Sequence, residues 1–343
     1  MKTQAAPGIE PGQAWEVDLF RPEDAEGVVR LFLSVYGEKY PIRTYVEPSR
    51  LKQENAKGVT ISSVARTKTG DIVGHNALFR SAPHEGIYES GAGLVDAGYR
   101  GGKGIFTQLV AHGQEVAARQ FGIEAIYGES VCNHPFSQKM THGLGWITHA
   151  VQVDLMPASA YEKEKSAEGR VSVLLDVKTL KSMPHPVHIP YAYRDSLTFI
   201  YEGLDDERRF IASEKGLPSD TKTRMQVQIF DFAQVARVTV NEAKSDFASA
   251  VDKLEQDLKK KGVQVVQVWL NLAWPWIGAA VDVLRAKQFF LGGLLPRWFN
   301  TDGLLMQKVS GAPQWEALHI HFERARTLVQ RVKDDWREVG GSR

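Results

Sequence analysis

The sequence has 343 residues, which suits two ordinary domains or one large α/β domain. Lys and Arg total 42 against 41 Asp and Glu, so the formal net charge is +1, with 24% charged and 43% hydrophobic residues. This composition is that of a folded globular protein, and it excludes a disordered or polybasic chain. We therefore expect no nucleic-acid partner.

Cysteine content and hydropathy restrict the cellular compartment and the kinds of metal or disulfide site that we expect. Cys132 is the only cysteine, so an internal disulfide and a cysteine-based zinc framework are excluded. No stretch approaches the ~18 consecutive apolar residues of a membrane span, and residues 1–15 lack the apolar core of a signal sequence. We expect a cytoplasmic protein with no membrane partner. His319 and His321 lie outside any HExxH-type spacing, and we predict no metal.

The first half of the chain alternates between predicted strands and helices. Strands are expected at 17–20, 59–66, 71–79, 87–95 and 123–131, and helices after Pro22 and after Gly104. Residues 67–70 contain a glycine among polar residues and suit a hairpin turn. A hairpin therefore leads to a third strand, a glycine-rich loop, a helix and a central strand.

The second half shows the same succession of elements. Its predicted elements are a helix at 193–203, two strands within 225–240, a helix at 246–261, a strand at 263–272, a helix at 279–287, a strand at 303–309 and an amphipathic helix at 315–336. The last helix suits packing across a domain or a partner in a homodimer. The common order indicates an internal duplication and a mixed-sheet α/β fold.

Composition predicts the domain boundaries. Residues 156–169 are Ala, Ser, Lys and Glu with little apolar content, which is typical of a linker. We expect a flexible N-terminus at 1–14, a first domain at 15–155, a linker at 156–190, a second domain at 191–311 and a C-terminal helix at 312–343.

Glycines gather between the third strand and its helix, over residues 95–106. Such a junction presents unpaired N–H groups at the positive end of the helix dipole, which suits a phosphate. Arg100 and Lys103 add positive charge. A Walker A motif fails because Gly104 follows Lys103 and because Ala97 stands five positions before Gly102. The dinucleotide motif G-x-G-x-x-G also fails.

The loop resembles the central motif of the GNAT superfamily of acyl-coenzyme A transferases. The matching residues are Val95, Tyr99-Arg100 and Gly102-Lys103-Gly104-Ile105. One extra glycine separates Arg100 from the Gly-Lys-Gly run, and Phe106 replaces the last small residue. The strand at 126–131, Asn133 and the Gly-Leu-Gly-Trp-Ile run at 143–147 resemble the second signature of the family.

The resemblance implies two tandem GNAT-like domains and a function. The first domain would transfer an acetyl or other acyl group from coenzyme A to an amine, carried by a small molecule or a peptide. The amide of Leu94 or Val95 would hold the thioester carbonyl oxygen. The residues implied in binding acetyl-coenzyme A are Leu94, Val95, Arg100, Gly101, Gly102, Lys103, Gly104, Ile105 and Asn133.

Many relatives take a general base from a glutamate on the strand before the glycine loop, where burial raises a carboxylate's pKa. Glu89 has that place, and strand alternation puts it on one face with Gly91 and Gly93. Glu129 on the adjacent strand is the rival. For both, the alternative is an ion-paired or solvated strand-end carboxylate.

The sequence offers no tyrosine as the general acid at the expected position. Thr141 stands where many relatives have a tyrosine, with Ser137, His134 and His142 nearby, and water alone is the alternative proton source. Cys132 would need a base and a lowered pKa to act as a nucleophile, so we favour a buried packing role for it.

The second half lacks a glycine loop. Residues 240–246 contain no glycine and carry two acids, which would repel phosphates. We expect a degenerate, non-catalytic copy that covers the cleft or recognises the acceptor. The aromatic residues at 269–299 suit core packing or, alternatively, an acceptor pocket. The rival function is a non-catalytic coenzyme A-binding or regulatory protein that retains the fold.

Overall fold

The structure is a computed structural model that describes residues 9–37, 40, 42–101, 104–157, 169–204 and 206–341. The chain divides into two compact units, Met1–Tyr127 and Gly128–Arg343. The division falls within strand β5 (Ala125–Val131).

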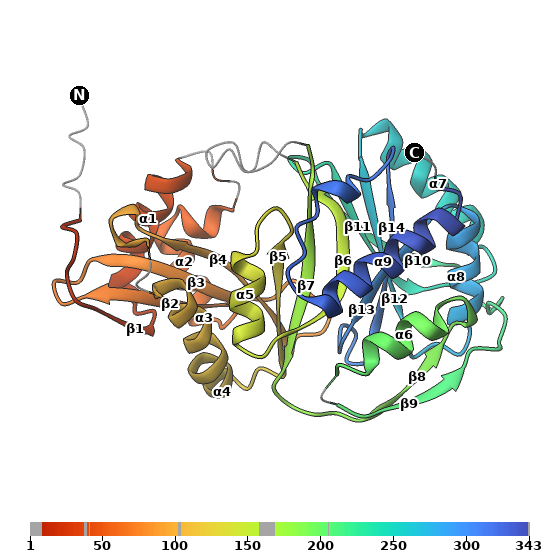
Figure 1. The fold of residues 1–343 in the computed structure, drawn as a ribbon, viewed down its shortest axis with the longest axis horizontal. Coiled ribbons are helices and arrows are strands. Elements are labelled where there is room, and N and C mark those ends of the chain that lie inside the picture. The colour runs from red at the N-terminus through yellow and green to blue at the C-terminus, as the bar shows by residue number, and fades with distance from the viewer. Residues whose placement is uncertain are drawn as a thin grey trace. The chain divides into compact units, whose positions relative to one another are not determined.

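Five strands form the sheet of the first unit, in the order β1-β2-β3-β4-β5 (Figure 1). The strands before β5 are β1 (Trp15–Leu19), β2 (Thr60–Thr67), β3 (Ile72–Phe79) and β4 (Ile87–Val95). The pairs from β1 to β4 are antiparallel, whereas β4 and β5 are parallel. A parallel pair needs a crossover, and the segment between β4 and β5 supplies it.

Helices cover both faces of this sheet. The helices of the first unit are α1 (Ala25–Tyr36), α2 (Pro48–Ala56), α3 (Ile105–His112) and α4 (Ala118–Phe121). Val64 of β2 packs in one apolar cluster with α1 and α2, and its neighbour Ala65 packs in another with α3. Adjacent strand residues point to opposite faces, so α1 and α2 lie on one face and α3 on the other.

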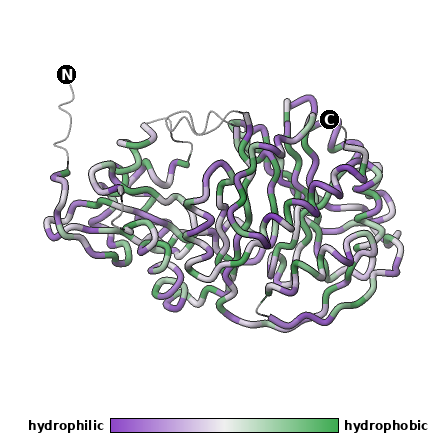
Figure 2. Tube along the Cα trace, in the orientation of Figure 1, coloured by the Kyte–Doolittle hydropathy of each residue, from purple (hydrophilic) through white to green (hydrophobic). Residues whose placement is uncertain are grey.

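Seven strands of the second unit pair in the order β7-β6-β13-β14-β12-β11-β10, and β8 and β9 form a separate parallel pair. Its strands are β6 (Ile147–Met156), β7 (Val171–Thr179), β8 (His185–Ile189), β9 (Arg208–Ala212), β10 (Arg224–Phe230), β11 (Val235–Glu242), β12 (Val265–Asn271), β13 (Phe290–Leu295) and β14 (Gly303–Val309). Its helices are α5 (Phe136–Gly143), α6 (Arg194–Tyr201), α7 (Phe247–Lys260), α8 (Ile277–Ala286) and α9 (Glu323–Glu338). Figure 2 shows apolar residues along the strands at the centre of this unit.

The expected mixed α/β fold is confirmed, and the order of elements repeats along the chain. In the first copy, antiparallel β3 and β4 lead through helices to β5, which is parallel to β4. In the second, antiparallel β10 and β11 lead through α7 to β12, which is parallel to β11. Each copy thus places a helix between two strands that pair in parallel.

Several elements differ from those expected. Two strands, β7 and β8, lie inside the stretch 156–190 that composition indicates as a linker, because the run Val-Ser-Val-Leu-Leu at 171–175 is apolar enough to be buried. Residues 158–168 of that stretch lie outside the described residues. The amphipathic helix predicted at 315–336 begins only at Glu323, and a 3-10 turn occupies Trp315–Ala317.

No helix in the described ranges is long and apolar enough to cross a membrane.

The close packing of α3 on β3 can be tested at Gly74. A Cβ added there would meet Ile105 Cγ2 at 2.9 Å and Leu109 Cδ1 at 3.0 Å. Because overpacking a tight core costs about 1–3 kcal/mol, Gly74→Ala should lower the free energy of unfolding by that amount. At Gly143 nothing lies within 4 Å of an added Cβ, so Gly143→Ala is the matched control and should not destabilise. Urea unfolding would measure both, and equal stability of the two variants would contradict this packing.

Candidate active site

The pairing of β4 changes partway along the strand. Its parallel ladder with β5 joins three pairs and ends at Glu89 opposite Tyr127, although β4 continues to Val95. On its other edge, the register with β3 shifts between the pairs Ala77–Gly91 and His75–Leu94. Ala92 has a φ of 50°, in the left-handed region, which marks a β-bulge. The second half of β4 therefore leaves one of its edges without a β5 ladder.

Glu89 is held at the point where the ladder ends. Its Oε2 accepts a hydrogen bond from Ser81 Oγ at 2.7 Å and another from the Tyr127 hydroxyl at 2.8 Å. The side chain is half-buried, so one part of the carboxyl group is fixed while the residue still reaches solvent. A fixed carboxylate at the end of a ladder is well placed to take a proton.

The bulge corrects one expectation from strand alternation. An added Cβ on Gly91 would lie 3.6 Å from Glu89 Oε1, so Gly91 shares the face of Glu89, as expected. Gly93 does not share it, because an added Cβ there would meet Phe106 of α3 and Asn76 Oδ1. The extra residue at Ala92 reverses the alternation, and sequence spacing gives no sign of it.

A buried histidine fixes the bulge. His75 Nδ1 lies 2.9 Å from the carbonyl oxygen of Ala92, which can only accept, so Nδ1 carries the proton and donates. Its Nε2 then accepts from Ser62 Oγ at 3.0 Å. Burial lowers the pKa of His75 to about 4, against the smaller opposite effect of the Ala92 hydrogen bond. The imidazole is therefore neutral near pH 7 and keeps this tautomer.

The bulge also sets the direction of the amides that follow it. The N–H of Asp96 donates to Val73 O of β3 at 2.9 Å. N–H groups two residues apart on a strand point the same way, so the Leu94 amide faces β3 and the Val95 amide faces away from it. Of the two candidate amides, Val95 is thus the one directed toward the open edge of β4.

The glycine loop is described at both ends. Gly101 and Gly104 have φ values of 84° and 66°, which only glycine adopts readily, and Gly104 caps α3, whose first residue is Ile105. Arg100 is exposed and its Nε donates to Val95 O at 2.9 Å. Gly102 and Lys103 lie outside the described residues, so their predicted role stays a prediction.

Glu129 forms part of a closed polar ring in the second unit. Its Oε1 accepts from Arg237 Nη2 at 2.8 Å and from Gln152 Nε2 at 2.9 Å. Gln267 completes the ring by accepting from Arg237 and donating to Gln152. This arrangement favours the ion-paired alternative for Glu129, because a proton taken by its carboxylate would break the ring.

The Thr141 hydroxyl also has a hydrogen-bond partner within the chain. This buried hydroxyl donates to Asp176 Oδ2 at 2.8 Å. Ser130 and Thr148 donate to the same carboxyl group, each at 2.6 Å. Burial raises the pKa of Asp176 and these hydrogen bonds oppose the rise. A hydroxyl that donates to a buried carboxyl group is poorly placed to protonate a leaving thiolate.

The residues around the end of β5 offer little reactive chemistry. Burial raises the pKa of Cys132, which leaves its thiol protonated and supports the packing role. Asn133 follows it in a half-buried position. His142 stacks on Phe322 with ring centroids 3.9 Å apart.

The matching junction of the second copy is closed by its own chain. Between β11 and α7, the Lys244 amide donates to Thr223 Oγ1, the Ser245 amide to Pro218 O and the Phe247 amide to Lys244 O. These amides are not available to a phosphate. The degenerate, non-catalytic role of this copy stays a prediction.

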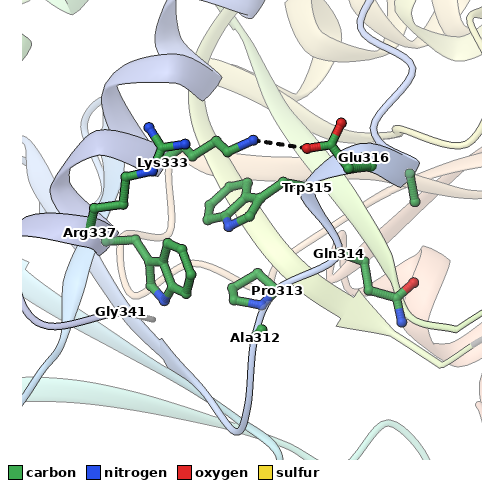
Figure 3. A pocket seen from close by; sticks show the side chains of 10 residues that line it. Ala312, Pro313, Gln314, Trp315, Glu316, Lys333, Arg337 and Gly341 are labelled. Carbon is green, nitrogen blue, oxygen red and sulfur yellow. Dashed lines mark hydrogen bonds and ion pairs between the residues drawn. The ribbon is translucent and has the colours of Figure 1, made fainter. Parts of the chain in front are cut away.

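The second unit also has a hollow of about 650 Å³ beside α9 (Figure 3). Trp315, Pro313, Lys333 and Arg337 line it, and Lys333 is paired with Glu316 at 3.2 Å. Lys333 and Arg337 each have an acidic partner, so the rim has no marked charge preference. None of the predicted site residues lines this hollow.

Among the described residues, no group of three or more His, Cys, Asp or Glu side chains is arranged to hold a metal ion.

Sequence reasoning missed four residues around Glu89 and the bulge: Ser81, Tyr127, His75 and Ala92. Tyr127 was detectable in principle, because it stands directly opposite Glu89 in a predicted neighbouring strand. Ala92 has no such signal, since alanine rarely adopts a positive φ.

The chain was compared with known protein families, curated proteins and solved structures, and only solved structures are similar to it. No model of a protein family matches the chain, and no curated protein matches it. A ribosomal-protein-S5-alanine acetyltransferase from Vibrio fischeri is similar at 15% identity over 51% of this chain and 97% of its own, with a TM-score of 0.39. An N-acetyltransferase from Staphylococcus aureus Mu50 has 15% identity over 49% and 99%, with a TM-score of 0.40. A ribosomal-protein-alanine N-acetyltransferase from Brucella melitensis has 19% identity over 48% and 99%, with a TM-score of 0.38. At these levels any function must rest on the residues themselves.

The neutral state of His75 makes stability depend on pH. Between its unfolded pKa of roughly 6.5 and its folded pKa of about 4, the unfolded chain binds a proton that the folded chain does not. The free energy of unfolding should therefore fall as pH falls through this window, by up to about 3 kcal/mol.

His149 has a pKa lowered in the same way, to about 4, so the measurement is best made in a His149→Gln background. There, His75→Asn should flatten the dependence of urea unfolding on pH between 6.5 and 4. An unchanged slope would show that His75 is not held neutral.

Proposed function

We propose that the first unit transfers an acyl group, most simply acetyl, from coenzyme A to an amine. The single observation that carries this proposal is the opening of β4: its ladder with β5 ends at Glu89, and the bulge at Ala92 turns the Val95 amide toward the open edge. A carboxylate and an N–H donor thus lie on one strand, six residues apart. The resemblance of the glycine loop to GNAT acyltransferases supports the same function.

The chemistry divides between these two groups. The acceptor nitrogen attacks the thioester carbon and loses its proton through water to the Glu89 carboxylate, because six residues of a strand span about 20 Å. The Val95 N–H stabilises the negative charge that forms on the carbonyl oxygen. The carbon–sulfur bond then breaks, the electron pair leaves on sulfur, and the thiolate takes a proton from water, since Thr141 donates to Asp176.

The glycine loop would bind the diphosphate of coenzyme A. Its proposed donors are the amides from Gly101 to Ile105, at the positive end of the α3 dipole, with the charges of Arg100 and Lys103. Leu94 would contact the rest of the carrier. The packing of Phe106 over Gly93 keeps α3 close to β4, where the family has a small residue.

Glu89→Gln tests the proposed base. The variant should retain its affinity for coenzyme A, release thiol from acetyl-coenzyme A and an amine at least about 100-fold more slowly, and lose the acidic limb of its pH–rate profile. The control is Glu85→Gln, which changes an exposed carboxylate two residues before the start of β4. This variant should behave as the wild type.

An unchanged rate in Glu89→Gln would reject the role of Glu89. If no amine in a broad panel supports thiol release by the wild type, while coenzyme A still raises its melting temperature, the protein is a non-catalytic binder.

A charge reversal tests the loop. Lys103→Glu should weaken coenzyme A binding more than about fivefold, beyond the ~1 kcal/mol of an exposed ion pair. Lys68→Glu reverses a charge in the turn between β2 and β3 and should leave affinity unchanged. Isothermal titration would measure both, and equal affinities would place the diphosphate elsewhere.

A further inference from the structure

One edge of strand β10 has no partner strand among the residues that the structure describes. β10 pairs only with β11, and it ends the strand order of the second unit. Its counterpart in the first copy, β3, has a neighbour on each side, β2 and β4. Within the described ranges, no backbone hydrogen bond reaches the outer edge of β10. The N–H and C=O groups on that edge are therefore open to another strand.

The ladder on the far side of β11 shows which residues of β10 face this edge. The Val265 N–H of β12 donates to the carbonyl oxygen of Gln234, just before β11, at 3.2 Å. By alternation, the even-numbered residues of β11 face β12 and the odd-numbered residues face β10. The odd-numbered residues stand opposite Gln226, Gln228 and Phe230, whose backbone groups therefore face β11. The residues of β10 whose N–H and C=O groups point outward are Met225, Val227 and Ile229.

The sequence of β10, Arg-Met-Gln-Val-Gln-Ile-Phe, is self-complementary in an antiparallel pair. A twofold axis at Val227 places this residue opposite the same residue of a second copy. Met225 then stands opposite Ile229, and Gln226 stands opposite Gln228. Because the outward-facing residues fall opposite one another, the two strands can exchange six backbone hydrogen bonds. Each apolar residue at the centre of the pair meets an apolar one, and each amide side chain meets an amide.

Edge strands usually carry a charge, a proline or a bulge that prevents such pairing. β1, the edge strand of the first unit, follows this pattern. A self-pair about the middle of β1 would bring Glu16 opposite Asp18 of the second copy, and like charges in that position are destabilising. From Met225 to Phe230, β10 has no charge and no proline, and its register shift with β11 lies before this run. β10 thus lacks the features that keep β1 unpaired.

The exposed apolar surface also favours β10 over the C-terminal helix as a dimer contact. Val227 is 40% exposed, although Met225 and Ile229 on the same face of β10 pack against the core of the second unit. Helix α9 has no comparable exposed apolar side chain, because its apolar face is already buried in that core. The buried residues of α9 include Ala325, Leu328 and Val332.

We propose that two copies of this chain associate through antiparallel pairing of their β10 strands about Val227. The pairing is a form of strand addition, in which backbone hydrogen bonds supply the affinity and the side chains fix the register. A contact through seven residues of each copy is small beside the ~800 Å² per partner of a stable complex, so association should depend on concentration. No residue of β10 belongs to the proposed active site, and the pairing is therefore independent of acyl transfer.

Sedimentation equilibrium of the full chain tests the association. The wild type should pass from monomer toward dimer as its concentration rises from about 1 μM to about 200 μM. Over the same range, the amides of Met225, Val227 and Ile229 should exchange their hydrogens more slowly, because pairing protects them. A monomer at every concentration would overturn the proposal.

A charge swap on exposed side chains tests the register. Combining Gln226→Lys with Gln228→Lys brings lysine opposite lysine at both crossings and should weaken dimerisation at least about fivefold. Combining Gln226→Lys with Gln228→Glu is the matched control, because it brings lysine opposite glutamate and should keep or strengthen the dimer. Urea unfolding checks that both variants fold. Equal dimerisation of the two would show that β10 does not pair with itself.

A proline tests the backbone hydrogen bonds. The Val227 N–H points outward, so Val227→Pro removes no bond to β11 but removes two bonds of the dimer. This variant should fold and remain monomeric. Gln228→Pro removes an N–H that faces β11 and should lower the free energy of unfolding more than Val227→Pro does. A folded Val227→Pro variant that dimerises as tightly as the wild type would overturn the proposal.

Discussion

One backbone distortion sets the geometry of the second half of β4. At Ala92 the chain of β4 adopts a positive φ, and the strand gains one residue relative to β3. An alanine in this conformation costs about 1–2 kcal/mol, which the surrounding structure must offset. The hydrogen bond from buried His75 to the Ala92 carbonyl and the packing of Ala92 on the α1 and α2 cluster contribute to that offset. The direction of the Val95 amide depends on this bulge, whereas Ser81 and Tyr127 hold the Glu89 carboxylate.

The two copies show why a common order of elements does not imply a common site. In the first copy, the junction after β4 has two glycines with positive φ and a helix that begins at once. In the second, the amides after β11 donate to Thr223, Pro218 and Lys244. An amide that already donates within the chain has no hydrogen bond left for a phosphate. The second copy therefore keeps the framework, but these amides at its junction already have acceptors within the chain.

Much of the framework could be predicted from the sequence. The bounds expected for β4 and β14 agree with Ile87–Val95 and Gly303–Val309, because apolar runs bounded by polar turns are local signals. Helix α2 was missed because Leu51 is its only buried residue, and β7 was missed because a polar stretch precedes it.

The site was less predictable, since its contacts join residues far apart in the chain. Glu89 was predicted as a base from its place on β4, but its partners Ser81 and Tyr127 required a known strand register. Glu129 accepts a hydrogen bond from Arg237, and Thr141 donates one to Asp176. No short sequence motif connects these partners.

A crystal structure of the full chain with bound acetyl-coenzyme A would test the opening of β4 most directly. The thioester carbonyl oxygen should accept a hydrogen bond from the Val95 amide, and water should connect the acceptor side of the thioester to the Glu89 carboxyl group. A Val95 amide paired with a carbonyl group of β5, or a thioester bound away from β4, would contradict this mechanism.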